Sequence, residues 1–479
     1  MIGKSEGASL SYSEALKIIE AEASKLSSSS TNIEELVPLP LSLNRISSRN
    51  YVSPESTPKF DTSAMDGYAL NSEVAATASP EEPVRFCVMG TSAAGDSPVE
   101  VRGEPDGDIY PCVEIMTGAR FPTCVDRREF DCCVKVEDTR MEPGGKIIQV
   151  LKPARKGMNR RFAGTDFQQG DNIIDAGDCV KINHLMALAS IGVEKIAVRR
   201  KPRIAVFSTG KELLQNDGAQ SDAQRIMDIN GPCITASLTD WGCDVEFLGV
   251  IDDNASAVSG RIMQQLQLRE YDILMTTGGV SAGKFDFVRK AVESIGAKVL
   301  FHGAAIRPGH PVLFATLPSG RYDSTGGRDY PLNKQTSTAL FGLPGNPVAS
   351  AACLRFLVVP LLRQLLSEQP ERPMKATIRD GNLPWKGEKT CNIGVASDII
   401  TRLPPNTDVF RAGRFTLQQS DKFEVEIIHD HSPGKIKPFL GADCWIHIPR
   451  GHTELKDGDA LDVYPICKQE HGLAALLRS

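Results

Sequence analysis

The sequence predicts a multidomain protein of α/β and β architecture, and three observations carry this prediction. The chain has 479 residues, enough for roughly three or four domains at ~100–200 residues each. Short apolar runs alternate with helical patterns between residues 201 and 366, as in a doubly wound parallel sheet with helices on both faces. The flanking segments are richer in Pro, Gly and short β-branched runs, which is typical of small β domains.

These changes of pattern divide the chain into four predicted domains. Residues 1–48 together with 151–200 form a mixed linker domain. Residues 49–150 form a β-rich domain inserted into it. Residues 201–367 form the α/β domain, and residues 368–479 form a small C-terminal β domain.

Two helices are predicted before the α/β domain. Ser11 and Glu14 have the spacing of a capping box, and apolar residues then recur at helical intervals as far as Leu26. We therefore expect a helix over 11–26. A second helix is expected near residues 184–191.

The elements of the α/β domain are expected in alternating order. Strands are predicted at 203–207, 245–250, 271–275, 299–301, 312–317 and 339–343, and helices at 232–241, at 285–295 and from Pro347 onward. The polar, Gly-rich residues 320–338 are interpreted as an exposed insertion. Because ligands of open α/β sheets bind beyond the carboxyl ends of the strands, the loops at that edge are the candidate site.

Composition and charge exclude several classes of protein. Charged residues are 24% and hydrophobic residues 41% of the chain, which is ordinary usage and excludes a largely disordered chain. The net charge of −6 argues against general nucleic-acid binding. The apolar runs, such as 356–362, are far shorter than the ~18 residues of a membrane span, and residues 1–6 show no signal region. We expect a cytoplasmic protein without a membrane segment.

The 12 cysteines do not predict a metal site or a disulfide framework. The sequence contains no C-x-x-C pair, and Cys132 and Cys133 are adjacent. Most of the cysteines are expected to be small buried apolar residues in a reducing compartment.

Four predicted strand ends are followed by unusual loops. Glycine lets the backbone approach a ligand closely, and free N–H groups at a helix start favour phosphate. Asn346 suits an N-cap, with Pro347 at the first helical position. Each loop alone could be merely a tight turn, but four at one edge favour a ligand site. The loops are 208–210, 276–279, 307–311 and 343–347.

Acidic residues recur beside Gly and hydroxyl residues. Carboxylates can hold Mg²⁺ or orient an attacking water. Each also has an ordinary interpretation: Asp66 with Gly67 is a common turn dipeptide, and Glu212 suits the first turn of a helix. The acids are Asp61, Asp66, Asp166, Glu212, Asp228 and Asp286.

A basic run stands out in this acidic chain. It comprises Lys152, Arg155, Lys156, Arg160 and Arg161. Such a run can receive an anionic substrate through charge-assisted hydrogen bonds. A solvated surface is the alternative interpretation.

Other candidate motifs are rejected. Residues 278–284 have the spacing of a Walker A loop, but Phe285 stands where Ser or Thr should hold Mg²⁺. His429 and His431 lack a third ligand and are interpreted as loop residues. No Ser-His-Asp signature or G-x-S-x-G elbow occurs.

Nine motifs occur between residues 60 and 350 of the chain. They are FDTSAMDGYAL (60–70), IMTGARFP (115–122), FDCCVKVEDT (130–139), GMNRRFAGTDFQQGD (157–171), STGKEL (208–213), DINGP (228–232), TTGGVSAGKFDFV (276–288), IRPGHP (306–311) and GLPGNPVAS (342–350). With these motifs the chain resembles the MoeA family of molybdenum insertases, which includes the E domains of the plant insertases and of animal gephyrin. The α/β domain is then MogA-like.

The resemblance implies a reaction. Family members bind adenylylated molybdopterin, insert molybdate at its dithiolene and release AMP in a Mg²⁺-dependent step. The implied function is that of a molybdopterin molybdotransferase. Two alternatives stay open: a non-enzymatic scaffold of the gephyrin E-domain type, and an enzyme that acts on another nucleotide.

The resemblance also implies roles for individual residues. The implied catalytic group is Asp61, Thr117, Asp166, Glu212, Asp228 and Asp286, with Glu212, Asp228 and Asp286 toward Mg²⁺. The implied substrate-binding group is Ser63, Asp66, Thr209, Thr277, Gly278, Gly279, Ser281, Pro344, Gly345, Asn346 and Ser350, with Arg307, Pro308 and Gly309 toward molybdate or the terminal phosphate. Ser350 enters because Ala349 stands where the family often has Ser. Lys284, Arg307 and His310 are further departures.

The resemblance finally implies partners. A homodimer is expected, in which each site lies between the α/β domain of one subunit and the β domain of the other. A MogA-type adenylyltransferase domain is a further candidate partner.

Overall fold

The chain forms two compact units, each with its own cores. Unit 1 comprises Met1–Leu36, Asn44–Ser48 and Ala197–Ser479, and unit 2 comprises Val37–Leu43 and Arg49–Ile196. The computed structural model describes residues 9–29, 34–103, 105, 107–124, 129–214, 225–280, 287–318, 337–368, 370–379, 399–416, 423–428, 432–466 and 468. The division into four domains stays a prediction.

Unit 1 contains a six-stranded sheet. Its order is β16 (Asp244–Ile251), β15 (Arg203–Thr209), β17 (Ile273–Thr277), β21 (Ser337–Leu343), β20 (Leu313–Pro318) and β18 (Lys298–His302). The first four strands run parallel, but β20 is antiparallel to both of its neighbours. The doubly wound α/β domain is therefore confirmed, whereas the expectation of an all-parallel sheet is wrong at β20. The connection from β18 to β20 is short, and a parallel crossover needs a dozen or more residues.

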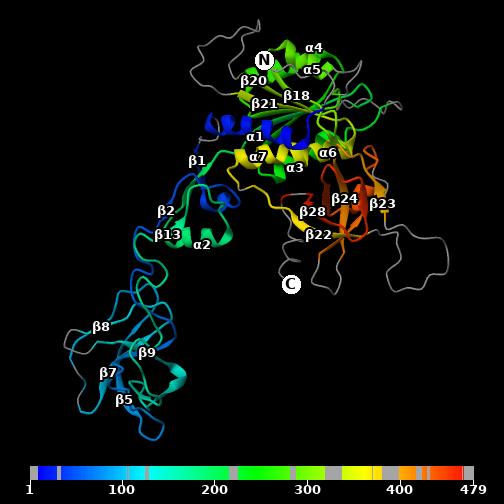
Figure 1. The fold of residues 1–479 in the computed structure, drawn as a ribbon. Helices are drawn as coiled ribbons and strands as arrows, with labels where there is room; N and C mark the ends of the chain where they lie inside the picture. Colours follow the sequence, from blue (N-terminus) through cyan, green and yellow to red (C-terminus); the bar gives the residue numbers. More distant parts are fainter. Residues whose placement is uncertain are drawn as a thin grey trace, which may run out of the picture. The chain divides into compact units, whose positions relative to one another are not determined.

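Helices cover both faces of this sheet (Figure 1). One face packs against α1 (Tyr12–Ser29), α3 (Asn230–Asp240), α6 (Pro347–Cys353) and α7 (Val359–Leu365), and the other against α4 (Ala255–Leu268) and α5 (Phe287–Ser294). Alternate residues of β15 serve the two cores: Val206 lies in the first and Phe207 in the second. Helix α4 is absent from the sequence-based expectations; its N-cap, Asn254, accepts a hydrogen bond from the Ala257 N–H at 2.7 Å.

A continuous helix runs from Pro347 to Leu365, as expected from Pro347 onward. It comprises α6, the π-helical turn η3 (Leu354–Val358) and α7. Pro360 has no N–H for the Phe356 carbonyl four residues earlier, and the Tyr12 hydroxyl of α1 donates to that carbonyl at 3.2 Å. Among the described residues this is the one helix long and apolar enough to cross a membrane, but 78% of its most apolar window is buried. It is a core helix of unit 1.

The C-terminal part of unit 1 is a β structure, as predicted, and its sheet is closed by the pairing of β24 with β26. The sheet order is β19 (Ile306–Arg307), β24 (Asp408–Thr416), β25 (Glu424–Ile427), β22 (Met374–Arg379), β28 (Ala460–Pro465) and β26 (Cys444–Ile448), and β26 also pairs with β24. β23 (Ile399–Arg402) pairs with β27 (Glu454–Lys456), and η4 spans Pro438–Gly441. Strand β19 follows β18 of the α/β sheet along the chain but pairs with β24 of this second sheet.

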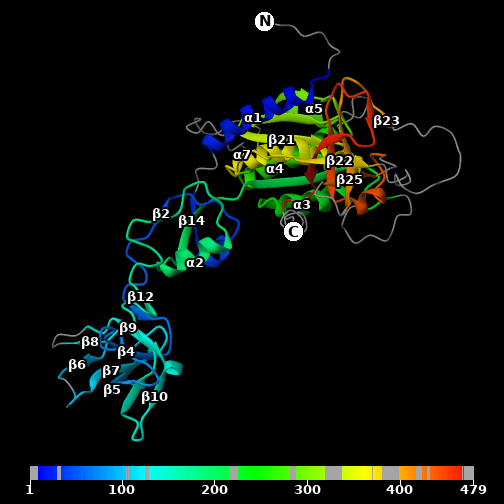
Figure 2. The same ribbon diagram turned by 60° about the horizontal axis from the view of Figure 1, so that its bottom comes forward.

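Unit 2 is rich in β structure, in agreement with the predicted inserted β domain (Figure 2). Its six-stranded sheet has the order β10 (Thr139–Met141), β11 (Ile147–Val150), β5 (Val84–Ser92), β7 (Tyr110–Ile115), β4 (Gly67–Leu70) and β9 (Cys132–Lys135). Small pairs are β12 (Arg160–Arg161) with β3 (Thr62–Ser63), β13 (Asn172–Ile174) with β2 (Tyr51–Val52), and β6 (Glu100–Val101) with β8 (Thr123–Cys124). Helix α2 (Ile182–Ser190) and the 3₁₀ turns η1 (Leu39–Ser42) and η2 (Val136–Asp138) complete it. The chain passes between the units within β1 (Glu34–Pro38), after Leu43, after Ser48 and within β14 (Lys195–Arg199). Strands β1 and β14 pair with each other.

Two smaller expectations can be compared with the described residues. The ten described cysteines are all free, and most of them are buried, as predicted. Of the expected insertion, residues 320–336 lie outside the described ranges, whereas Ser337 and Thr338 belong to β21.

Candidate functional site

The predicted strand-end loops of unit 1 lie at one edge of its sheet. Ser208 pairs with Thr277, and Thr277 pairs with Leu343. On the far side, Gly342 pairs with Leu313, the first residue of antiparallel β20. The loops after β15, β17 and β21 and the turn before β20 therefore meet at the same edge, as expected.

Hydrogen bonds join three of these loops. The Thr209 hydroxyl donates to the Thr277 carbonyl at 3.3 Å, and the Thr277 hydroxyl donates to the Pro344 carbonyl at 3.1 Å. The Gly278 N–H donates to the Leu343 carbonyl at 3.0 Å. Both threonines are buried, so their hydroxyl groups bond to the neighbouring loops and not to water. These hydrogen bonds hold the loops together.

The two glycines after β17 are required by close contacts. Gly278 has φ +92°, and a Cβ there would lie 2.3 Å from the carbonyl oxygen of Thr209. Gly279 has φ +66°, and its Cβ would lie 2.2 Å from the ring of Phe287. Any other residue would therefore move the loop.

Asn230, at the start of α3, forms hydrogen bonds with two of these loops. Its side-chain amide donates to the Thr277 hydroxyl at 2.9 Å and to the Gly345 carbonyl at 2.8 Å. Asn230 lies in the DINGP motif but was not among the predicted site residues. Its position at the start of a helix was the available signal.

Asp228 is held two residues before Asn230. Its carboxylate accepts hydrogen bonds from the Ser208 hydroxyl at 2.6 Å and from the backbone N–H groups of Asn230 and Gly231 at 3.0 and 3.1 Å. It thereby caps the first turn of α3, where a negative charge is also favoured by the helix dipole.

The loop that carries Arg307, Pro308 and Gly309 packs against α6. Gly309 has φ +112°, and a Cβ there would lie 2.5 Å from the Cys353 sulfur. The Cys353 thiol donates to the Gly309 carbonyl at 3.3 Å. Arg307 itself is exposed and pairs with Val409 at the start of β24.

A second arginine, Arg411, lies beside Arg307. It is only 5% exposed, and its Nε atom is buried without a hydrogen-bond partner. Burial first, and then the positive charge of Arg307, lower the pKa of the Arg411 guanidinium to about 10. Within the described residues neither arginine has an acidic partner, so the pair is suited to an oxyanion. Sequence reasoning missed Arg411, whose signal is an arginine between Phe410 and Ala412 inside a buried strand.

The start of α6 differs from the expectation. Asn346 is the N-cap residue, as predicted, but its side chain makes no capping hydrogen bond. The first available helical N–H, that of Val348, donates to the Pro433 carbonyl at 3.0 Å. This N–H is therefore occupied within the chain. Ser350 is 2% exposed, and its hydroxyl has no partner.

Other acids lie near Glu212. Glu212 is exposed, and its carboxylate fills the space next to Gly210. Burial raises the pKa of nearby Asp253, the backbone N–H of Lys211 opposes this rise, and the charge of Glu212 adds to it. Sequence reasoning did not single out Asp253. Ser281 and Asp286 lie outside the described residues.

The described carboxylates at this edge of the sheet are too few to hold Mg²⁺ alone, so phosphate oxygens of the substrate would have to supply further ligands. The described ranges contain no group of three or more His, Cys, Asp or Glu side chains placed to hold a metal. The segments of Glu212 and Asp228 adjoin through the bridge between Leu213 and Ile226. Mg²⁺ commonly takes one or two carboxylates together with waters and substrate phosphates, and these two acids fit that pattern.

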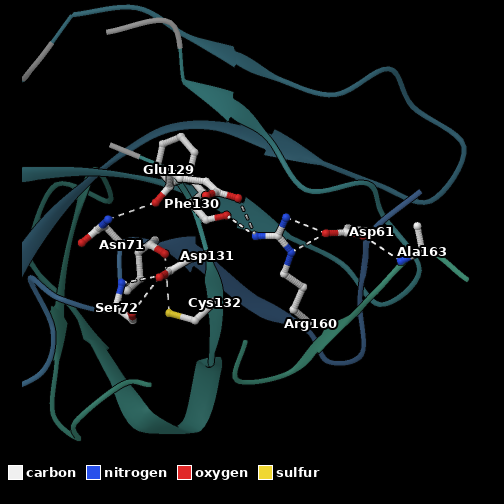
Figure 3. A network of polar contacts seen from close by, with 10 residues as sticks. Asp61, Asn71, Ser72, Glu129, Phe130, Asp131, Cys132, Arg160 and Ala163 are labelled. Atoms are coloured by element: carbon white, nitrogen blue, oxygen red, sulfur yellow. Dashed lines mark hydrogen bonds and ion pairs between the residues drawn. The ribbon is translucent and has the colours of Figure 1, made fainter. Parts of the chain in front are cut away.

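The remaining predicted residues lie in unit 2, and their acids are already paired there. The guanidinium of Arg160 donates to Asp61 (Nε···Oδ2 2.6 Å), and the Ala163 N–H donates to the other Asp61 oxygen at 2.7 Å. Figure 3 shows Arg160 with Asp61 on one side and Glu129 on the other. Asp166 forms an ion pair with Arg161.

Asp66 is held by Thr117. Both the backbone N–H and the hydroxyl of Thr117 donate to one Asp66 oxygen, at 2.7 and 2.9 Å. The backbone bond first, and the hydroxyl second, hold the pKa of Asp66 below its usual range. Ser63 is buried, and its hydroxyl donates to the Met65 carbonyl at 2.6 Å. These contacts order the SAMDG turn.

The basic run is largely neutralised within unit 2. Arg160 and Arg161 pair with the acids just described, and Lys152 pairs with Asp138 at 2.5 Å. This agrees better with a structural role than with a free anion-binding surface.

Comparison with known families matches three successive regions of the chain. Residues 10–192 match the MoeA N-terminal region (domain I and II), residues 205–364 match a probable molybdopterin binding domain, and residues 394–466 match the MoeA C-terminal region (domain IV).

Relatives and solved structures match over nearly the whole chain. A molybdopterin molybdenumtransferase of Synechococcus elongatus is 33% identical over 454 residues, which covers 95% of this chain and 99% of the relative. One of Staphylococcus aureus is 28% identical and covers 89% and 90%. A solved MoeA protein of molybdopterin biosynthesis from Pyrococcus horikoshii superimposes with a TM-score of 0.69 at 25% identity, covering 96% and 100%.

Proposed function

The chain belongs to the MoeA family, and on this premise we propose that it is a molybdopterin molybdotransferase of molybdenum cofactor biosynthesis. Its substrates would be adenylylated molybdopterin and molybdate. The enzyme would insert molybdate at the dithiolene and release AMP by hydrolysis of the phosphoanhydride. The observation that carries the proposal is the set of joined loops at the sheet edge, together with two arginines that have no acidic partner among the described residues.

The joined loops are assigned to the nucleotide part of the substrate. Gly278 and Gly279 let the loop after β17 pack tightly against Thr209 and Phe287, and Asn230 keeps Thr277 and Gly345 in fixed positions. A preformed binding surface loses little entropy when it binds a ligand. The residues assigned to this role are Thr209, Thr277, Gly278, Gly279, Ser281, Pro344, Gly345, Asn346 and Ser350.

The two arginines are assigned to the oxyanion. Arg307 is exposed and can move toward molybdate, whereas Arg411 is fixed inside the barrel wall. A buried guanidinium without a counter-ion is costly until an anion arrives, so this pair favours binding of molybdate or a terminal phosphate. Gly309 packs against Cys353 of α6, so Pro308 and Gly309 would hold in place the loop that carries Arg307.

The acids are assigned to proton transfer and to the metal. Glu212, Asp228 and Asp286 would face the phosphoanhydride, and Asp61, Thr117 and Asp166 of unit 2 would complete the catalytic group. Mg²⁺, when bound with substrate phosphates, would offset their charge and polarise the phosphoryl oxygens. Asp228 has both oxygens hydrogen-bonded, so its orientation is set before substrate binds.

We extend the proposal to assembly and location. The protein would act in the cytoplasm as a homodimer in which both subunits contribute residues to each site, supplied by a MogA-type adenylyltransferase. Light scattering at micromolar concentration should report twice the 52.0 kDa chain mass. A monomer with full turnover would remove the shared site from the proposal.

The activity is tested with purified protein. Adenylylated molybdopterin, molybdate and Mg²⁺ are supplied, and AMP and molybdenum cofactor are measured, with molybdate omitted as the control. We expect stoichiometric AMP and cofactor; the absence of turnover would favour the scaffold alternative. Asp286→Asn should reduce turnover, and wild-type activity in that variant would remove Asp286 from the catalytic group.

A further inference from the structure

Unit 2 contains an open pocket, the hollow, of about 770 Å³. No part of the substrate is placed in it by the proposed function. Three phenylalanines are among the residues that line it. Phe121 and Phe130 are buried, whereas Phe60 is 46% exposed. Asp61 also lines the hollow, so a ligand here would lie beside one of the residues assigned to the reaction.

Arg120 lies over the exposed ring. Its guanidinium carbon is 3.7 Å from the centroid of the Phe60 ring. Within the described ranges this guanidinium has no ion pair or hydrogen bond, whereas neighbouring Arg160 is bound to Asp61 and Glu129. A planar cation stacked on an exposed ring offers a flat surface on which another ring can stack.

A carboxylate is placed at the same hollow. Glu129 lines it, and its side chain is 67% exposed. Arg160 holds the carboxylate through one oxygen at 3.2 Å, and Figure 3 shows the two side chains in contact. An ionised carboxylate is acceptor-only and can take two parallel N–H bonds from a donor edge.

We propose that this hollow binds the pterin ring of the substrate. The pyrimidine edge of a pterin carries an N–H next to an amino group, and this donor pair matches the Glu129 carboxylate. Its flat face matches the Phe60 and Arg120 stack. The adenine ring of the same substrate stacks equally well but has no such adjacent donor pair. This inference rests on the proposed function.

The full-length protein is titrated with pterin itself, and quenching of pterin fluorescence is followed. Phe60→Leu and Arg120→Gln should each weaken binding about tenfold, since stacking of a base on a side chain is worth ~1–3 kcal/mol. Glu129→Gln changes only an exposed side chain, so it should weaken binding without affecting folding. Unchanged pterin affinity in all three variants would overturn the inference.

Matched controls lie outside the hollow. Arg85 is 45% exposed and paired with Glu142, and Phe423 is 40% exposed in unit 1. Arg85→Gln and Phe423→Leu should bind pterin with wild-type affinity. An equal loss in these variants would mean that the tenfold effects are nonspecific, and the inference would fall.

Titration with AMP separates the two ring sources. AMP affinity should be the same in Phe60→Leu as in the wild type; a loss for AMP without a loss for pterin would assign the hollow to adenine instead. The activity assay is read separately. If pterin binding depends on Phe60 while pure protein releases no AMP, the inference holds and the proposed function fails. If AMP release proceeds with an unchanged KM in Phe60→Leu, the proposed function holds and the inference fails.

Discussion

Units 1 and 2 differ in how the charged residues of the candidate site are paired. In unit 2 the motif acids are already engaged: Asp61 by Arg160, and Asp66 by Thr117. In unit 1 the loops are joined by hydroxyl, amide and backbone groups, and the cations Arg307 and Arg411 have no acidic partner among the described residues. Among the described residues, the motif acids of unit 2 are therefore already engaged, whereas two arginines of unit 1 lack an acidic partner.

The largest expected effect is on Arg411. Arg411→Met keeps most of the side-chain volume but removes the buried charge, and we expect turnover to fall about 100-fold, as when a fixed charge-stabilising donor is lost. Stability should rise by about 1 kcal/mol, because an unpaired buried charge no longer has to be desolvated. AMP release and urea denaturation measure the two effects. A large loss of stability would mean that Arg411 has a structural partner, as the arginines of unit 2 do.

The second prediction concerns how the unit 1 loops are held. Gly278→Ala should lower the free energy of unfolding by about 3 kcal/mol, because it adds left-handed strain to a 2.3 Å contact with Thr209. Gly296 is the control, since its φ is +82° and a Cβ there meets nothing within 4 Å. Gly296→Ala should cost only the strain, about 1 kcal/mol. Equal losses would show that the close contact contributes nothing.

The third prediction tests the anchor role in unit 2. Arg160→Met should cost about 2 kcal/mol, because the pair is 14% and 24% exposed and its loss leaves the Asp61 charge poorly solvated. Arg161→Met is the matched control, since its pair with Asp166 is 50% and 41% exposed and should contribute only about 0.5 kcal/mol. The double variant Arg160→Met, Asp61→Asn should have a higher free energy of unfolding than Arg160→Met alone, because the unpaired charge is removed. Urea denaturation measures the difference. No recovery would argue against an ion-pair anchor.

The smallest expected effect is a pH-dependent one at Asp66. A carboxyl group whose pKa is lowered on folding adds stability above its unfolded pKa, 3.8, and that stability is lost as pH falls through the folded pKa. Thr117→Val removes the hydrogen bond from the Thr117 hydroxyl to Asp66, the second cause of the lowered pKa, and keeps the bond from the backbone N–H. It should therefore destabilise the protein at pH 7 and become neutral at pH values well below 3.8. A difference that persists unchanged at low pH would show that the hydroxyl acts by packing alone.

The sequence predicted the edge of the sheet well. Short apolar runs followed by Thr-Gly or Pro-Gly place loops at strand ends, and β15, β17 and β21 put those loops side by side. The antiparallel direction of β20 was not predictable, because strand direction depends on the connection and leaves no local pattern. Helix α4 was missed since its polar Gln and Ser residues weaken the apolar period.

The electrostatic states of the site residues could not be predicted either. Arg411 becomes an anion-site candidate only because β19 pairs with β24 and brings Arg307 beside it. Asp61 becomes an anchor only because β12 pairs with β3, which brings Arg160 near. Both facts depend on pairings between segments far apart in the chain, and spacing in the sequence contains no such information.

The contact between α1 and the π-helical turn has a consequence for synthesis of the chain. Tyr12 and Phe356 are separated by 344 residues, so at ~5–20 residues per second the first helix waits roughly 20 to 70 s for its partner. All of unit 2 is translated during that interval. The apolar face of α1, which ends buried against α7, is therefore available to a chaperone on the ribosome long after the residues of unit 2 have emerged.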